Sequence, residues 1–267
     1  MKKIFNIFWF LLSIILSVTI IELSLVYLGL KNNIVYYSSN YYGYYHLPNQ
    51  SIERRGKKVS TDILGNRNPK ENTIENSEIF FVGDSITFGG SVVNNENIFA
   101  HLIAKKLNKK YLNISSNGWG VVNMVNFIDF HNLYKKDSTY VLTCIIDCFT
   151  RNLRRSKQNY FFKDKSKYAI SSLIKYSIFL INNYNYSTNK VEKTYVEKDN
   201  YETINYSINQ LVEFEKKLKS INSELIIIYS PNTKEFKNYI SNTKLYKDDY
   251  KKIMLNRLNA SNIKYID

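Results

Sequence analysis

Short apolar runs and longer amphipathic stretches alternate from residue 77 onward, and they predict an ordered series of strands and helices. The expected strands cover residues 78–82, 111–115, 140–146, 224–229 and 263–266. The expected helices cover residues 98–107, 121–134, 201–221 and 245–259, and a further helical patch at 170–181 lies within a polar insertion at 151–196. Strands that alternate with helices at these spacings predict a parallel sheet between helical layers, that is, an α/β protein with a three-layer α/β/α sandwich.

A different pattern occupies the amino terminus, where residues 4–21 are almost wholly apolar and follow Lys2 and Lys3. As a helix, this run spans about 27 Å, close to the thickness of a bilayer core. No small-x-small cleavage site follows Glu22, so we expect an uncleaved transmembrane anchor rather than a signal peptide. The two lysines favour a cytoplasmic amino terminus, which places the rest of the chain outside the cytoplasm.

The pattern therefore divides the chain into three segments. We expect an anchor helix at 1–30, a juxtamembrane linker at 31–76 and the α/β domain at 77–267. Six tyrosines gather in the linker, and either an interfacial aromatic belt or an ordinary Tyr-rich linker explains them. They are Tyr36, Tyr37, Tyr41, Tyr42, Tyr44 and Tyr45.

Composition changes this picture little. The formal net charge is +14, but Lys, Asn, Ile and Tyr are spread over the whole chain, which indicates a compositional bias rather than a basic patch. The sequence has no glycine-rich phosphate loop and no Cys/His cluster with zinc spacing, so we expect no nucleic-acid partner, no cofactor and no metal. Along one strand, Cys144 and Cys148 would lie about 13 Å apart, too far for a disulfide, and we expect two buried thiols.

The strongest candidate for chemistry follows the first strand of the domain. The apolar run stops at Gly83, and Asp84 and Ser85 come next, at the strand end where ligands collect in parallel sheets. A glycine permits the sharp turn, and backbone N–H groups after Ser85 can face a developing anion. The alternative is a structural turn in which Asp84 or Ser85 only caps a helix. Thr87 stands where the Gly-x-Ser-x-Gly elbow of α/β-hydrolases has its second glycine.

These residues, with two later blocks, resemble the conserved blocks of the SGNH hydrolases, also called GDSL lipases and esterases. The first block is 83–85, the second is 113–118, which ends at Gly118, and the third is 147–152. Residues 61–67 resemble a lead-in of the membrane-anchored bacterial members, and residues 227–235 resemble a strand end of that group. The resemblance covers residues 20–267 and implies a flavodoxin-like parallel sheet.

The resemblance also implies a reaction. Ser85 would be the nucleophile that attacks an acyl carbonyl, and the N–H groups of Ser85 and Gly118 would bind the oxyanion. The substrate would be an acyl ester, such as an O-acetyl group on an envelope glycan, a lipid or a small ester. In the family, an Asn side chain from the third block completes the oxyanion hole, and an Asp-x-x-His block near the carboxyl end supplies the base.

The third block of this chain departs from the family pattern. Asp147 stands where the family has Asn, and Cys148 stands where it usually has Asp. A carboxylate offers no N–H donor, and the loss of one oxyanion donor costs about 2.7–4 kcal/mol of barrier stabilisation. Asp147 could still donate if burial kept it protonated. Asn152 is a second candidate donor if the register shifts.

The second departure from the family pattern concerns the catalytic base. We expect none of the three histidines to serve, because His46 lies in the linker, His101 on the surface of the helix after Ser85, and His131 near the end of the next helix. The chain stops at Asp267, which we expect to be a strand-end residue, before any Asp-x-x-His, and we therefore expect the SGNH-like domain to be incomplete at its carboxyl end. We therefore expect at most weak esterase activity. The alternatives are a non-catalytic envelope protein that binds glycan or a partner, and an O-acetyltransferase of the same fold.

Overall fold

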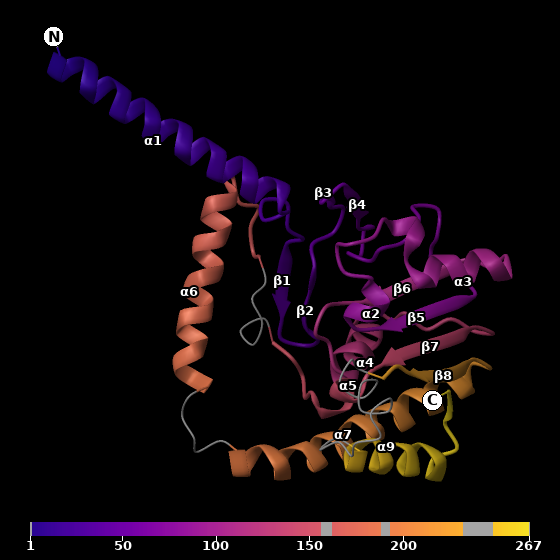
Figure 1. Ribbon diagram of the computed structural model, residues 1–267. Coiled ribbons are helices and arrows are strands. Elements are labelled where there is room, and N and C mark those ends of the chain that lie inside the picture. The colour runs from indigo at the N-terminus through magenta and orange to yellow at the C-terminus, as the bar shows by residue number, and fades with distance from the viewer. Residues whose placement is uncertain (1, 156–161, 188–192, 232–247, 267) are drawn as a thin grey trace.

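The computed structural model describes residues 2–155, 162–187, 193–231 and 248–266, and five parallel strands form its central sheet (Figure 1). The strands are β5 (Ile79–Gly83), β6 (Tyr111–Ser115), β7 (Thr139–Cys144), β8 (Glu224–Tyr229) and β9 (Lys264–Ile266). They pair in the order β6-β5-β7-β8-β9, so that the first strand in sequence lies between the second and the third. This is the order of flavodoxin-like sheets, and the predicted parallel sheet is confirmed.

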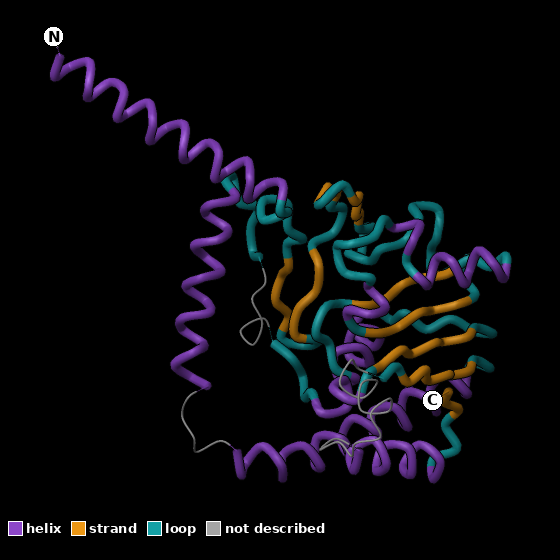
Figure 2. Tube along the Cα trace, viewed as in Figure 1, coloured by secondary structure: helices purple, strands orange, loops and turns teal. Residues whose placement is uncertain are grey.

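Helices cover both faces of this sheet (Figure 2). On β5, Phe80 and Val82 pack into the larger core, whereas Ile79 and Phe81 pack into a smaller core on the opposite face. The smaller core contains the buried side of α3 (Phe99–Leu107). The larger core contains residues of α4 (Val121–Phe130), α7 (Lys193–Ser220) and α9 (Asp248–Ala260). Burial on two faces explains why β5 is an unbroken apolar run.

One predicted strand ends early, and this changes the position of the cysteines. Strand β7 stops at Cys144, and a short helix, α5 (Ile146–Thr150), begins where residues 145 and 146 were expected to continue the strand. The chain therefore turns between Cys144 and Cys148, so the strand spacing expected for them is wrong. Both thiols are free and buried, as expected. Burial and the neighbouring Cys148 thiol raise the pKa of Cys144.

The segment expected as a linker contains two antiparallel hairpins. They are β1 (Tyr36–Ser39) with β2 (Gly43–His46), and β3 (Ser51–Arg54) with β4 (Lys57–Ser60). Tyr44 and Tyr45 are fully buried in the larger core. The Tyr45 ring lies 4.9 Å from that of Trp119, and the Tyr44 hydroxyl donates to Asn117 O at 2.8 Å. Both interpretations of the tyrosine cluster are therefore wrong for these two residues, which are core side chains of the domain.

The amino-terminal helix α1 (Lys2–Tyr27) projects away from the rest of the molecule and has no buried residue (Figure 1). It is the one helix in the described part of the chain that is long and apolar enough to cross a membrane. The β3–β4 hairpin lies against its carboxyl end, where Arg54 Nε donates to Gly29 O at 2.6 Å and Arg55 Nε donates to Leu28 O at 2.9 Å. These bonds pair backbone carbonyls just past the helix end. A second apolar helix, α6 (Ala169–Ser187), contacts α1 and confirms the predicted helical patch.

Candidate functional site

The central position of β5 defines the candidate site. Gly83, the last residue of β5, pairs in register with Ser115 of β6 on one side and with Thr143 of β7 on the other. From β5 the chain crosses to β6 on one side, and from β6 it crosses back past β5 to β7 on the other side. The order of the strands in the sheet therefore reverses at β5. In open α/β sheets, the crevice at such a reversal is where ligands bind. The turns after these three strands carry Ser85, Gly118 and Asp147, and the fold brings all three predicted residues to one edge.

The turn after β5 presents Ser85 to solvent. Asp84 is the N-cap of the short helix α2 (Ser85–Phe88), because its Oδ1 accepts the N–H of Ile86 at 2.9 Å. The capping alternative therefore holds for Asp84, but Ser85 is the first helical residue and is exposed. Among the described residues, no hydrogen bond engages the Ser85 hydroxyl, so it is available to a ligand.

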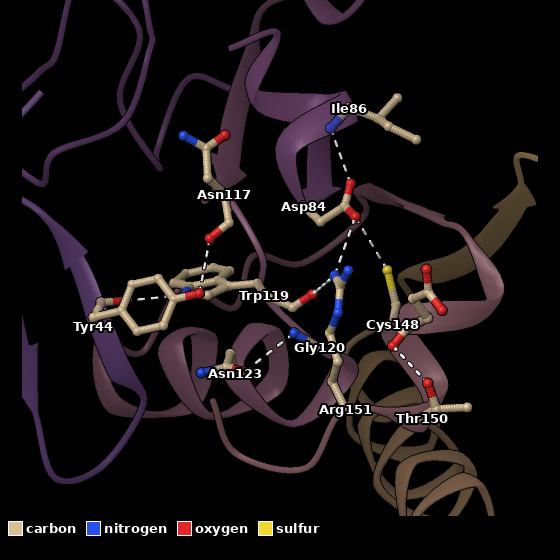
Figure 3. Close-up of polar contacts among 11 residues, drawn as sticks. Tyr44, Asp84, Ile86, Asn117, Trp119, Gly120, Asn123, Cys148, Thr150 and Arg151 are labelled. Carbon is tan, nitrogen blue, oxygen red and sulfur yellow. Dashed lines mark hydrogen bonds and ion pairs between the residues drawn. The ribbon is translucent and has the colours of Figure 1, made fainter. Parts of the chain in front are cut away.

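Asp84 is the buried charge of this site, and two groups from α5 and the residue after it face its second oxygen (Figure 3). The Cys148 thiol lies 3.6 Å from Asp84 Oδ2, and Arg151 Nη1 lies 3.5 Å from the same atom. Arg151 Nη1 also donates to Trp119 O at 3.0 Å. Burial raises the pKa of Asp84, whereas the Ile86 N–H and the Arg151 charge oppose that rise. Arg151 thus joins the turn after β5 to the loop after β6.

Gly118 occupies a conformation that suits an anion-binding N–H. Its φ of +76° lies in the left-handed region, which favours glycine, and the residue is partly exposed. The loop is held beside β5 because Ser116 N donates to Gly83 O at 3.3 Å. Within the described part of the chain, the Gly118 N–H makes no hydrogen bond. It therefore keeps a donor at the edge where Ser85 lies.

In the third block, the residue at the family's Asn position has a carboxyl group instead of an amide donor. Asp147 lies partly exposed in the first turn of α5, and its backbone oxygen accepts the Thr150 hydroxyl at 3.2 Å. Asn152 is exposed, and its side-chain oxygen accepts the N–H of Leu153 at 2.7 Å. Asp147 thus lies at the same edge of the sheet as Ser85 and presents a carboxyl group there, whereas the Asn152 side chain makes only a local contact with the next residue.

His46 is buried beneath the site rather than exposed in it. Its Nδ1 lies 3.1 Å from Gly65 O and its Nε2 lies 3.3 Å from Ser116 Oγ, while its ring stacks on Phe88 with 4.3 Å between centroids. A carbonyl only accepts, so Nδ1 carries the proton and Nε2 accepts the Ser116 hydroxyl. Burial lowers the pKa of His46 to about 3. His46 is therefore a neutral imidazole buried in the fold at physiological pH.

The buried imidazole predicts a loss of stability in acid. In the unfolded chain the pKa of His46 is about 6.5, so between pH 6.5 and pH 3 only the unfolded state binds this proton. This group therefore leaves the free energy of unfolding at its full value above pH 6.5 and lowers it as the pH drops further. We expect a decrease of about 2 kcal/mol between pH 7 and pH 5. Urea unfolding of the full chain in detergent at both pH values measures it. The variant His46→Gln should lack this share of the pH dependence, and an unchanged dependence in that variant would contradict the prediction.

The other two histidines also lie away from Ser85. His101 is on α3, and its Nδ1 is 3.4 Å from the Tyr111 hydroxyl. His131 caps the carboxyl end of α4, at the opposite edge of the sheet, and burial lowers its pKa. All three histidines of the sequence are thus placed, and among the described residues none forms a hydrogen bond with Ser85.

Arg67 is a site residue that sequence reasoning did not single out. It is 1% exposed and donates to four acceptors in the segment after Ser85. These are Phe88 O at 2.8 Å, Gly90 O at 2.6 Å, Val93 O at 2.8 Å and Asn95 Oδ1 at 2.9 Å. Burial lowers the pKa of Arg67 to about 10, so the side chain stays charged at neutral pH. The one signal in the sequence was its place in the 61–67 block. Arginine is rarely fully buried without paired partners, so its burial could not be predicted from its residue type.

The part of the chain that the structure describes contains no group of three or more His, Cys, Asp or Glu side chains that could hold a metal ion. Three residues named from the sequence, Lys234, Glu235 and Asp267, lie outside the described residues. Compared with protein-family models and with curated proteins, the chain matches none.

Proposed function

We propose that this chain is a membrane-anchored hydrolase of the SGNH type that acts on acyl esters, with Ser85 as its nucleophile. The observation that carries the proposal is the exposed Ser85 hydroxyl at the reversal point of a parallel sheet, which makes no hydrogen bond to any described residue. Gly118, in the turn after the neighbouring strand, has an N–H that is likewise unengaged within the described part of the chain. The fold alone hosts many functions, so the argument depends on these groups.

The residues suggest the following steps. Ser85 Oγ attacks the carbonyl carbon of the ester and loses its proton to solvent, while the N–H groups of Ser85 and Gly118 bind the oxyanion. Collapse breaks the bond to the alkoxide, which takes up a proton from solvent and leaves as the alcohol, and an acyl group stays on Ser85. Water then attacks this acyl-serine, which releases the acid and restores the hydroxyl. No histidine of this chain takes the Ser85 proton, so we expect slow turnover.

The proposed substrate is an acyl ester on an envelope glycan, a lipid or a small molecule. With α1 across the membrane and Lys2 and Lys3 on the cytoplasmic side, the domain lies outside the cytoplasm, where such substrates occur. An O-acetyltransferase would share the acyl-serine step and differ in the acceptor, a sugar hydroxyl instead of water.

One observation favours a second candidate, a non-catalytic protein that binds glycan or a partner. Arg151 donates to Trp119 O and faces Asp84, and no histidine lies at this edge. A site with these groups and no catalytic base can bind a polar ligand without catalysing its reaction.

The test compares hydrolysis of p-nitrophenyl acetate by the full chain with that of two alanine variants. Ser85→Ala should lower the rate at least about tenfold, whereas Ser220→Ala, an exposed serine at the end of α7, should leave it unchanged. Mass spectrometry should find the acetyl group on the peptide that contains Ser85. Equal rates for all three proteins would overturn the hydrolase, and glycan binding retained by Ser85→Ala would then support the binding protein.

A further inference from the structure

Helix α6 carries a broad apolar face. From residue 173 to residue 181, six large apolar side chains keep 37–63% of their surface exposed. At 100° per residue these positions fall within an arc of about 200°, whereas the exposed Lys175 lies on the remaining side, which is the pattern of an amphipathic helix with a wide apolar face. The six apolar side chains are Leu173, Ile174, Tyr176, Ile178, Leu180 and Ile181.

The start of α6 is fixed to the end of the apolar run of α1. Glu22 follows that run, and its carboxylate accepts the N–H of Ala169 at 2.6 Å and that of Ile170 at 3.0 Å. A carboxylate on the first N–H groups of a helix is a stable cap. With α1 across a bilayer, Glu22 lies near the boundary of the hydrocarbon core, and α6 therefore begins at that depth.

The direction of α6 keeps it near this depth. Figure 1 shows that α6 leaves α1 sideways near its carboxyl end, and that the five-stranded sheet lies on the far side of the hairpins from it. The angle between the two helices encloses an apolar groove, lined on α1 by Val18 and Leu23 and on α6 by Ile170 and Ile174. The groove continues the apolar surface of α1 onto α6.

Cations border this apolar surface. Lys163, Lys165 and Lys167 are exposed and precede α6. Lys57 and Lys58 are exposed on the hairpin whose Arg54 and Arg55 bind the carbonyls at the end of α1. Lysines at this level suit the anionic head groups of a bilayer surface.

We propose that α6 is an interfacial helix, which lies in the boundary between head groups and acyl chains of the leaflet where α1 emerges. The bilayer, rather than a second copy of this chain, covers its apolar surface, because this surface continues that of α1 through the shared groove and cations suited to lipid head groups border it. Such helices bury about 5–10 Å into the boundary. The inference rests on α1 as a membrane anchor and is independent of any activity of Ser85.

The test places a fluorophore at single new cysteines in the full chain, reconstituted in vesicles of three parts phosphatidylcholine to one part phosphatidylglycerol. The native Cys144 and Cys148 have no exposed surface and should not react with the fluorophore. Ile178→Cys reports on α6, Val18→Cys on α1, and Leu107→Cys on an exposed leucine of α3 that should meet water. Lipids with a nitroxide on the acyl chain quench fluorophores that lie within reach.

We expect acyl-chain nitroxide to quench position 178 at least about twofold, as well as position 18, and to leave position 107 unchanged. Quenching at 18 without quenching at 178 would overturn the interfacial helix while the anchor stands. No quenching at either position would overturn the anchor and, with it, the inference. Cross-links between copies at position 178, in the absence of quenching, would assign the surface to a dimer.

Discussion

Replacement of Arg67 by Met is expected to lower the free energy of unfolding by about 4 kcal/mol. Methionine fills a similar length but cannot donate, so the carbonyls of Phe88, Gly90 and Val93 lose this partner. Asn95 Oδ1, which also accepts the N–H of Ser60 at 3.3 Å, loses one of its two donors. Each buried acceptor left unpaired costs roughly 1–3 kcal/mol. Relief from the burial of the Arg67 charge offsets part of the sum.

Urea unfolding of the full chain in detergent, followed by circular dichroism, measures this loss. Arg257→Met is the matched control, because Arg257 is exposed on α9 and, among the described residues, donates only to Asn209; its change should stay within about 0.5 kcal/mol. Arg67→Lys should restore only part of the stability, since an ammonium group cannot reproduce the planar fork of donors. Equal losses for Arg67→Met and Arg257→Met would contradict the role that we assign to Arg67.

The second large effect is expected at the end of β5, where Gly83→Ala should cost at least about 3 kcal/mol. An alanine Cβ there would overlap the Thr87 hydroxyl, and would lie 2.7 Å from Thr87 Cβ and 2.9 Å from Thr143 O. The first two atoms belong to α2 and the third to β7, so the turn that presents Ser85 must shift. The same urea experiment measures the cost.

Two further variants isolate the steric cause. Among the described residues, the Thr87 hydroxyl is buried without a hydrogen-bond partner, so Thr87→Ala alone should cost little and should make Gly83→Ala less costly. The rescue should be partial, because Thr143 O stays close. Gly56→Ala meets no atom within 4 Å and has a φ of +67°, so its cost of about 1 kcal/mol reflects backbone conformation only. A Gly83→Ala cost no larger than that of Gly56→Ala would refute the steric argument.

The central sheet could be predicted because its signal is local. Strands β5, β6 and β8 are short apolar runs, and the sequence located each within one residue of its observed bounds. The hairpins at 36–60 could not be found in this way. Their strands have four residues each, and Tyr44 and Tyr45 are buried by Trp119 and α4, which lie more than 70 residues away in the chain. Tertiary contacts of this range leave no mark in a local pattern.

The same distinction applies to the candidate site. Ser85 stands in the turn directly after a strand, so residue type and position were enough to propose it, whereas Gly118 was proposed from the resemblance of its block to the SGNH hydrolases. The contact between Asp84 and Arg151 depends on β5 and β7 being neighbours, which follows from the strand order and not from either segment. The bend at Ile145 that brings α5 under Asp84 was missed because the apolar run continues through it.

The β1–β2 hairpin has a consequence for the order in which the molecule is made. Tyr44 bonds to Asn117 and Trp119, and Tyr42 O accepts the side chain of Asn123, across separations of 73–81 residues. At synthesis rates of about 5–20 residues per second, the hairpin is complete about 4–16 s before its partners exist. During that interval the aromatic segment must wait without its core, next to a helix that is long and apolar enough to cross a membrane.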